Sequence, residues 1–372
     1  MKIGVIGSSL KADERRVPIH PEHLGLIPDE VRRQLVFEQG YGERFGVSDQ
    51  ELAGRVGGLA SREELLELGA VLLLKPAVSD LQAMPEGGLI WGWCHCVQQS
   101  RIAQSAIDRR LTLLTFEAMY AWGPDGLPGR HSFYKNNELA GYCAVLHGLS
   151  LKGIDGLYGR QRKAVILGFG AVSRGAIYAL KAHGFTDITV CLPGPEHLIR
   201  EEIPGYRYLR VQQSSDEHTG LTVHDGTETP LIERLASADI LVNAVLQDPE
   251  QPLMFVSSAD QLKAGCLILD VSCDQGMGFA FARPTSFREP LIQIGHVDYY
   301  AVDHTPSYLW ESASWEISRA LLPYLPTLIT GNWNQNPTLA RAIEIEKGVI
   351  RNPKILSFQN RQSTYPHPPA DH

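Results

Sequence analysis

The most constraining feature of this chain is a glycine-rich stretch that follows an apolar run near its middle. Residues 163–176, KAVILGFGAVSRGA, are typical of a strand, a tight turn and the start of a helix. In a dinucleotide-binding βαβ unit, Gly168 would allow the turn, and Gly170 would let backbone N–H groups approach a pyrophosphate at the helix N-terminus. Ser173 replaces the usual third glycine, and Gly175 follows two residues later. A helix that needs small residues only for packing is therefore the alternative.

Composition narrows the class of protein further. The chain has 372 residues, 44% of them hydrophobic, which is enough for two domain cores. A net charge of −8 gives no basic footprint for nucleic acid, and no apolar run is long enough to span a membrane. The N-terminus is typical of a short strand and not of a signal peptide. We expect a cytoplasmic protein that binds neither nucleic acid nor membranes; a homo-oligomer is left open.

The six cysteines lie in apolar or strand-like surroundings, so we expect buried free thiols in a reducing compartment. They are Cys94, Cys96, Cys143, Cys191, Cys266 and Cys273. The triplet Cys94-His95-Cys96 suggests zinc, but alternation along a strand would point His95 away from both thiols. We therefore expect no metal.

Hydrophobic patterning predicts an α/β chain. Predicted strands of a first domain cover residues 2–6, 35–38, 70–74, 89–93 and 111–116. Residues 136–151 have helical spacing and would connect to a second domain, with strands at 164–167, 187–192, 240–245 and 266–271. These apolar runs are typical of parallel strands covered on both faces. Thr305 and Pro306 predict a helix start, followed by one long helix through Leu325. The tail from about Asn360 is predicted to be disordered or loosely packed.

Three charged side chains stand where open α/β sheets place ligands. Lys75 and His95 each follow an apolar strand, and Arg16 lies in the loop after the first strand. A guanidinium suits a substrate carboxylate, a lysine suits a carbonyl oxygen, and an imidazole can transfer protons near neutral pH. A surface lysine, a histidine bonded to backbone and a solvated arginine are the alternatives; Arg15 is better suited to the solvated role. Asp274 could accept a hydrogen bond from a cofactor ribose or a substrate amine, while Asp270 could simply cap its turn.

Several segments, in order along the chain, resemble the alanine dehydrogenase, saccharopine dehydrogenase and carboxyethylornithine synthase family. They are residues 14–18 (ERRVP) with 20–21 (HP), 71–76 (VLLLKP), 91–96 (WGWCHC), 134–136 (YKN) with 140–142 (AGY), 269–276 (LDVSCDQG) and 302–307 (VDHTPS). Individual segments are similar to different members, so the resemblance names the family and leaves the subgroup open.

The resemblance implies two Rossmann-like domains with parallel sheets and an active site in the cleft between them. The first would be discontinuous, a substrate and catalytic domain of residues 1–134 plus 310–372, and residues 135–309 would bind the dinucleotide. Matching positions imply Lys75, His95 and Asp274 as catalytic residues, and Arg16, Lys135 and His304 as substrate-binding residues. The implied dinucleotide-binding residues are Gly168, Gly170, Ala171, Val172, Ser173, Leu192, Ala244, Val245, Asp274 and Asp303.

The implied reaction is hydride transfer between NAD(P) and a carbon that bears nitrogen, with an amino acid and a 2-oxo acid as partners. Leu192 or Pro193 stands where an acidic residue would hold the ribose of NAD, and no arginine follows until Arg200. Since the resembled synthase uses NADPH, we favour NADP over NAD. His304-Thr-Pro replaces the Asn-Met-Pro of alanine dehydrogenases and favours an opine-like secondary amine. The alternatives are an amino-acid dehydrogenase that uses ammonia, and a catalytically silent dinucleotide sensor or partner-binding protein.

Overall fold

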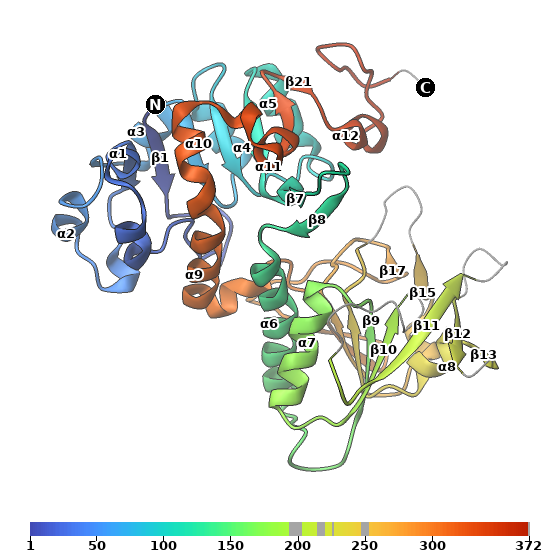
Figure 1. Ribbon diagram of the computed structural model, residues 1–372. Coiled ribbons are helices and arrows are strands. Elements are labelled where there is room, and N and C mark those ends of the chain that lie inside the picture. The colour runs from blue at the N-terminus through green and yellow to red at the C-terminus, as the bar shows by residue number, and fades with distance from the viewer. Residues whose placement is uncertain (193–202, 214–219, 225–226, 247–252, 371–372) are drawn as a thin grey trace. The chain divides into compact units, whose positions relative to one another are not determined.

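The computed structural model describes residues 1–192, 203–213, 220–224, 227–246 and 253–370. The chain forms two compact units: unit 1 comprises Met1–Tyr134 and Trp310–His372, and unit 2 comprises Lys135–Leu309. Each unit is built on its own sheet with helices against it (Figure 1). The predicted α/β class with two Rossmann-like domains is confirmed, with antiparallel strands added to both sheets.

The unit 1 sheet has eight strands in the order β21-β20-β6-β5-β4-β1-β2-β3. Six of them are parallel and follow the 3-2-1-4-5-6 order of a doubly wound fold, and β20 and β21 are antiparallel additions. The strands are β1 (Ile3–Ile6), β2 (Leu35–Glu38), β3 (Leu59–Ala60), β4 (Ala70–Leu73), β5 (Leu89–Gly92), β6 (Thr112–Thr115), β20 (Ile343–Glu346) and β21 (Val349–Ile350). The strand order reverses between β1 and β4, where such sheets bind ligands.

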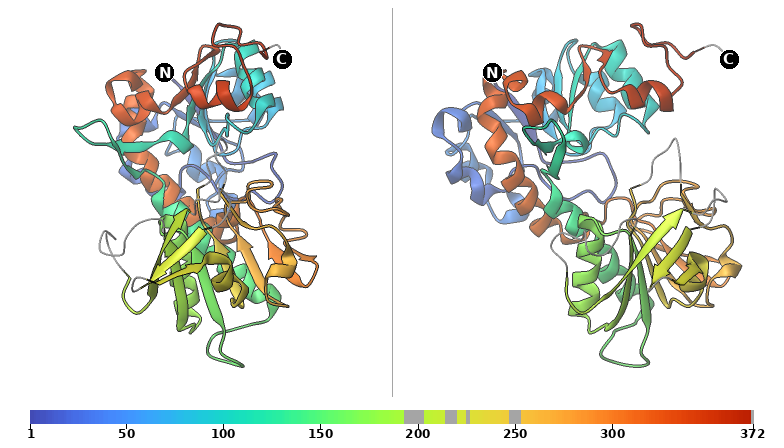
Figure 2. Two further views of the ribbon diagram at one scale, coloured as in Figure 1. Left: turned by 90° about the vertical axis from the view of Figure 1, so that its right-hand side faces the viewer. Right: turned by 45° about the vertical axis from the view of Figure 1, so that its right-hand side comes forward.

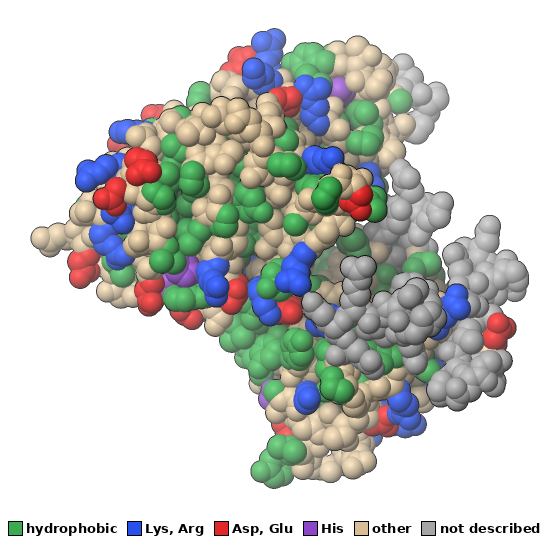
Figure 3. Space-filling view, viewed as in Figure 1, with side chains coloured by type: hydrophobic (Ala, Val, Ile, Leu, Met, Phe, Trp, Pro, Cys, Tyr) green, Lys and Arg blue, Asp and Glu red, His purple; other side chains and the backbone are tan. Residues whose placement is uncertain are grey.

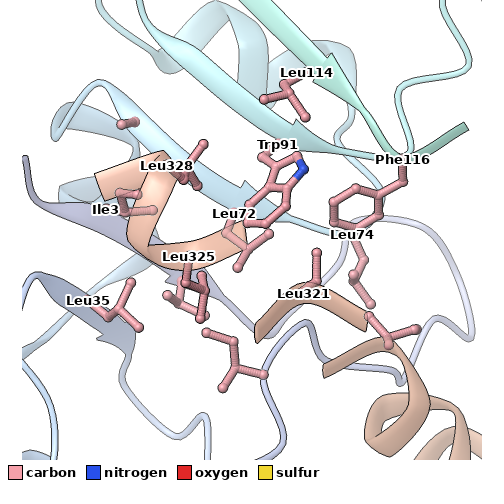
Figure 4. Packing of buried hydrophobic residues seen from close by; sticks show 14 of the residues in the cluster. Ile3, Leu35, Leu72, Leu74, Trp91, Leu114, Phe116, Leu321, Leu325 and Leu328 are labelled. Carbon is pink, nitrogen blue, oxygen red and sulfur yellow. The ribbon is translucent and has the colours of Figure 1, made fainter. Parts of the chain in front are cut away.

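Alternating residues of these strands supply two separate cores. Leu72 and Trp91 face a cluster completed by the C-terminal helices, whereas Val71 and Ile90 face the opposite helical layer. Figure 4 shows Leu321, Leu325 and Leu328 packed toward Leu72 and Trp91. The unit 1 helices are α1 (Asp29–Arg32), α2 (Asp49–Ala53), α3 (Arg62–Glu67), α4 (Val78–Ala83), α5 (Ser100–Asp108), α9 (Trp310–Leu321), α10 (Leu325–Thr330), α11 (Pro337–Arg341) and α12 (Pro353–Phe358). A short hairpin of β7 (Tyr120–Trp122) and β8 (Pro128–His131) also belongs to unit 1.

The unit 2 sheet has nine strands in the order β13-β12-β11-β10-β9-β14-β16-β19-β18. Its central six are parallel and again follow the 3-2-1-4-5-6 order. The strands are β9 (Lys163–Leu167), β10 (Asp187–Leu192), β11 (Arg207–Gln213), β12 (Gly220–His224), β13 (Thr227–Pro230), β14 (Ile240–Asn243), β16 (Leu267–Asp270), β18 (Leu291–Ile294) and β19 (Val297–Tyr300), with β15 (Met254–Val256) and β17 (Gly278–Phe279) in a separate pair.

Among its described residues, unit 2 has the α-helices α6 (Tyr134–Lys152), whose first residue closes unit 1, α7 (Ala171–Ala182) and α8 (Leu231–Ala236). Figures 1 and 2 show α6 and α7 side by side on one face of the sheet. A Cβ added at Gly175 would lie 1.7 Å from the Glu138 carbonyl oxygen, so only glycine allows this approach. Gly175 therefore serves helix packing and not the glycine turn.

Two sequence-based expectations are wrong. The helix after Pro306 is not continuous: Thr305–Leu309 is a 3₁₀ segment, and a second one, Leu322–Tyr324, separates α9 from α10. Pro323 and Pro326 cannot donate the backbone hydrogen bonds that one helix needs. Thr305 is the first residue of this 3₁₀ segment and not the N-cap before it, and its Oγ1 donates to the Ala140 carbonyl oxygen at 2.9 Å.

The tail after Asn360 is packed and not loose. His367 is 1% exposed, and its Nε2 accepts a hydrogen bond from the Ile350 backbone N–H at 3.0 Å. Arg361 donates to the His367 carbonyl oxygen, which closes the tail on itself. A buried polar side chain, which composition did not predict, holds the segment against β21.

The remaining patterns agree with the structure. Every predicted strand occurs, with its ends within two residues of the predicted ones. All six cysteines are buried and free, as expected. None of the described helices combines the length and apolar character that crossing a bilayer requires.

Candidate active site

Lys75 and His95 meet at the carboxyl edge of the unit 1 sheet. They follow the adjacent parallel strands β4 and β5, and the Lys75 Nζ lies 2.6 Å from the His95 Nε2. His95 has a φ of +49°, in the left-handed region that a residue with a Cβ rarely adopts. The surrounding structure therefore holds this imidazole in a specific place.

Glu117 is a third member of this group, and the sequence reasoning missed it. It follows β6, the next strand along the sheet, in the 3₁₀ segment Phe116–Ala118. Its Oε1 accepts the His95 backbone N–H at 2.5 Å and lies 3.3 Å from the His95 Nδ1. Burial, and then the nearby Glu344 carboxylate, raise the pKa of Glu117. An acidic residue directly after an apolar strand was the signal that could have revealed it.

Two cations lie close to the ring of Trp93. The Arg16 Cζ is 5.2 Å from its ring centroid, and the Lys75 Nζ is 5.7 Å from it. Burial, followed by repulsion from Arg16 and Lys11, lowers the pKa of Lys75. The cluster is therefore a positively charged place next to an aromatic face, which suits an anionic ligand.

Arg16 is buried, which is unusual for an arginine in a charged loop. Its Nε and Nη2 donate to the two carboxylate oxygens of Glu14, at 2.8 and 2.6 Å. The adjoining Val17 N–H donates to the Ser314 Oγ at 2.9 Å, which fastens the loop to α9. Arg15 is exposed, as expected. Glu14 thus holds Arg16 in place.

The glycine turn lies at the switch point of the unit 2 sheet, between β9 and β14. Gly168 has a φ of +92°, and a Cβ there would lie 3.1 Å from the Ala244 carbonyl oxygen. Gly170 precedes α7, and a Cβ there would meet nothing within 4 Å. The turn therefore leaves open space at the N-terminus of a twelve-residue helix.

Ser173 lies behind this turn, fully buried. Its Oγ has no hydrogen-bond partner among the described residues. Ala171 and Val172 open α7, and Ala244 and Val245 follow β14, so the structure gathers these predicted residues around the turn. A free helix N-terminus with room for a ligand fits a pyrophosphate.

The end of β10 carries no acidic group that could bind a ribose. Leu192 is 7% exposed and belongs to the core on the α6–α7 side of the sheet. Pro193 and Arg200 lie outside the described residues. The described part of this edge therefore lacks the carboxylate that selects NAD.

Two aspartates follow β16. Asp270 is buried and accepts hydrogen bonds from the Tyr299 hydroxyl at 2.7 Å and from the Asn243 amide at 2.9 Å. Burial, opposed by these hydrogen bonds, raises its pKa to about 6. It also accepts from the Cys273 N–H, which fits the turn-capping alternative. Asp274 is half-buried, and burial raises its pKa.

The other predicted ligand residues belong to unit 2. His304 is buried, and its Nδ1 lies 2.6 Å from an Asp303 carboxylate oxygen. Lys135 pairs with Glu138, one turn further along α6, at 2.5 Å. The structure therefore brings Lys75, His95 and Arg16 together in unit 1 and places Lys135, Asp303 and His304 in the other unit.

The cysteines beside His95 have a packing role. Cys94 and Cys96 are buried and share a hydrogen bond with each other, while His95 between them is partly exposed. Residues 94–96 lie after the end of β5, and His95 has a φ of +49°, so its separation from the two thiols does not come from strand alternation as expected. No group of three or more metal-ligating side chains occurs within the described ranges of the chain.

Comparison with known proteins identifies the family. Residues 147–353, more than half of the chain, match the model of the alanine dehydrogenase/PNT C-terminal domain. The chain belongs to the alanine dehydrogenase/PNT family. The predicted family and the predicted class, a nicotinamide-dependent oxidoreductase, are confirmed.

Individual relatives are distant. An N(5)-(carboxyethyl)ornithine synthase of Clostridium botulinum is 26% identical over 324 residues, covering 82% of this chain and 90% of that protein. An alanine dehydrogenase of Mycobacterium tuberculosis is 22% identical over 381 residues, covering 96% of each. A solved L-alanine dehydrogenase has a TM-score of 0.73 at 20% identity, covering 96% of this chain and 99% of that chain. A transhydrogenase from Sinorhizobium meliloti has a TM-score of 0.68 at 15% identity, covering 95% and 99%. At these identities the structures show the fold alone.

Proposed function

We propose that this protein reduces the imine formed between an amino acid and a 2-oxo acid, or oxidises the resulting opine-like secondary amine. The observation that carries the proposal is the 2.6 Å contact between Lys75 and His95 beside the buried Arg16. Such a cluster offers a cation for a carboxylate, a cation for a carbonyl oxygen and a group that transfers protons.

A bound nicotinamide would supply or accept the hydride at the carbon that bears nitrogen. We propose that the turn at Gly168 and Gly170 holds its pyrophosphate, while Asp274 bonds a ribose hydroxyl or the substrate amine. In unit 1, Arg16 attracts the carboxylate of the oxo acid, and Glu14 keeps its guanidinium oriented.

Proton transfers belong to the Lys75–His95 pair in this proposal. Protonated Lys75 stabilises negative charge on the carbonyl oxygen when the amine adds. His95 takes a proton from the attacking amine and returns one to the departing hydroxyl as water leaves. Glu117 is a positioning residue, because it bonds the His95 backbone and faces its Nδ1.

Two observations favour a secondary amine over ammonia. A synthase relative is 26% identical to this chain, against 22% for the alanine dehydrogenase. In addition, His304-Thr-Pro stands in this chain where alanine dehydrogenases have Asn-Met-Pro. Lys135 and His304 are proposed to contact the amino-acid partner. NADP is the proposed preference over NAD, since Leu192 supplies no ribose acceptor.

The test is an assay of NAD(P)H oxidation with pyruvate, 2-oxoglutarate and glyoxylate, each combined with ammonia, ornithine, lysine and arginine. We expect turnover with an amino acid as the amine and little with ammonia. Efficient turnover of pyruvate with ammonia alone would replace the proposal with an alanine-dehydrogenase-like reaction. Dinucleotide binding without turnover of any pair would favour a silent sensor.

A further inference from the structure

A guanidinium is stacked on the glycine turn. Arg174 lies in the first turn of α7, and its Cζ is 4.3 Å from the ring centroid of Phe169, the residue between Gly168 and Gly170. This contact fixes a positive charge beside the turn that is proposed to bind the pyrophosphate. Pyrophosphate binding by a glycine turn relies on backbone N–H groups, so this arginine needs a different explanation.

Phe169 shows on which side of the turn this charge lies. Its ring meets Tyr208 of β11 edge-on, with centroids 5.1 Å apart. β11 is the strand beyond β10, so Phe169 and the stacked arginine lie toward the strands where a Rossmann sheet holds the adenosine half of its ligand.

A second guanidinium stands on the same face. Arg210 is two residues after Tyr208 and therefore shares its side of the sheet, about 7 Å nearer the carboxyl edge. Its partner in the register is Leu192, the last residue of β10. Arg174 and Arg210 are both half-buried, so neither is an ordinary solvated surface charge.

We propose that Arg174 and Arg210 form a subsite for a phosphate monoester on the adenosine ribose, and thus select NADPH over NADH. The inference rests on the proposed function and names the residues that set its cofactor preference. A guanidinium fork matches the geometry and the charge of phosphate oxygens, whereas a ribose hydroxyl is uncharged. Leu192 adds no carboxylate that would repel the phosphate.

Equilibrium binding tests this without turnover. NADPH and NADH are titrated by nucleotide fluorescence into wild type, Arg174→Gln, Arg210→Gln and the double variant, and 2′,5′-ADP and 5′-AMP compete as fragments. Arg207→Gln is the matched control. Arg207 lies on β11, as Arg210 does, but it faces the opposite side of the sheet and forms an ion pair with Asp187.

In wild type we expect tighter binding of NADPH and of 2′,5′-ADP. Each Gln variant should weaken NADPH by roughly 10- to 30-fold and NADH by less than about twofold, since only a charge-assisted contact to the phosphate is lost. Arg174→Lys should recover part of the NADPH affinity because it keeps the charge, which separates this effect from misfolding.

Two results would overturn the subsite. One is wild-type affinity for NADH equal to or above that for NADPH. The other is an equal loss of affinity for NADPH and NADH in Arg174→Gln, which would mean that the guanidinium stacks on adenine. Failure of wild type to bind either nucleotide would instead contradict the proposed function itself.

Discussion

The two units of this protein share a strand order and differ in the residues at the ends of their strands. In unit 1, Lys75, His95 and Glu117 come after three successive strands, so charged side chains occupy the carboxyl edge. In unit 2 the centre of the same edge, between β9 and β14, carries Gly168, Gly170 and Ala244 and offers backbone and open space, while Asp270 ends the next strand, β16, and Asp274 follows it. One architecture thus supports two chemistries, because the loops and not the sheet determine the function.

Charge is also distributed differently along the strands. In unit 2, a group of ion pairs lies at the amino edge of the sheet. Asp239, directly before β14, accepts hydrogen bonds from the Lys163 N–H and from Lys263, and it forms an ion pair with Arg160. The shifted pKa values of Lys75 and Glu117 belong to the carboxyl edge of unit 1, and those of Asp270 and Asp274 belong to the carboxyl edge of unit 2. Elsewhere on unit 1, acidic and basic side chains are interspersed on the face shown in Figure 3. The ion pairs of Asp239 that stabilise the fold thus lie at the amino ends of the strands, whereas the charged groups that we propose to take part in the reaction lie at the carboxyl ends.

The strongest test of this division is removal of the proposed proton-transfer pair. Lys75→Ala and His95→Ala should each lower turnover roughly 10²- to 10⁴-fold. Dinucleotide affinity should change little, since the glycine turn belongs to the other unit. Steady-state kinetics and nucleotide titration measure the two effects. Lys354→Ala, which changes an exposed lysine of α12, is the control and should alter neither. Unchanged turnover would remove both residues from the chemistry.

A pair of glycine variants tests whether the unit 2 turn binds a ligand or only packs. Gly170→Val should keep the fold, because a Cβ there meets nothing within 4 Å, and should weaken dinucleotide binding by about 100-fold or more. Gly175→Val should instead destabilise unit 2, because its side chain would collide with the Glu138 carbonyl oxygen. Circular dichroism and nucleotide titration separate the outcomes. Normal affinity in folded Gly170→Val would leave the turn a purely structural role.

Asp239→Asn tests the stabilising charge of unit 2. Burial opposes ionisation of Asp239, but hydrogen bonds from Lys263, the Lys163 N–H and Arg160 outweigh it and lower its pKa to about 2. A lowered pKa stabilises the folded state above the unfolded value near 4, and this stability is lost as pH falls toward 2. At neutral pH the variant should lose about 1 to 2 kcal/mol, because its partly exposed cations are screened.

Urea unfolding at pH 7 and pH 2.5 measures this contribution. The difference between wild type and Asp239→Asn should be fully present at pH 7 and reduced to roughly a third at pH 2.5, because pH 2.5 lies between the unfolded pKa and the folded pKa of about 2. An equal difference at both values would mean that the carboxylate charge is not its source.

The smallest expected effect is a pair of opposite shifts in the pH profile. Arg16 lowers and Glu117 raises the pKa of Lys75. If protonated Lys75 is required, activity falls as pH rises through that pKa. Arg16→Gln should move the falling limb up by roughly half a unit to one unit, and Glu117→Gln should move it down. Exposed Arg15→Gln is the control; shifts of the same sign in both variants would exclude Lys75 as the titrating group.

Much of this molecule could be predicted from local patterns. The nine strands predicted from apolar runs all occur in the structure. The positions after two of them identified Lys75 and His95, whose contact follows from adjacent parallel strands. Their functional roles stay predictions. Those patterns act between neighbours in the chain or between successive strands, which is why one sequence was enough.

Long-range contacts could not be predicted in this way. The Val17 N–H bonds the Ser314 Oγ, 297 residues later, and fastens the Arg16 loop to α9. His367 fastens the tail to β21, and the strand register places Arg210 on the glycine-turn side of unit 2. Each of these contacts depends on which residues face each other in the folded chain, and the local patterns of a single sequence do not show that. Pro323 and Pro326, by contrast, were visible and should have divided the long helix.

The discontinuity of unit 1 also affects how the chain can fold as it is made. The Thr115 N–H bonds the Ala342 carbonyl oxygen, 227 residues later, and α9 and α10 complete the core around Leu72 and Trp91. On a ribosome the first 134 residues must therefore wait with an uncovered sheet face while all of unit 2 emerges. At about 5 to 20 residues per second, residues 135–309 take roughly 9 to 35 seconds to synthesise. Within a nascent chain, unit 2 can finish folding before the unit whose synthesis began first.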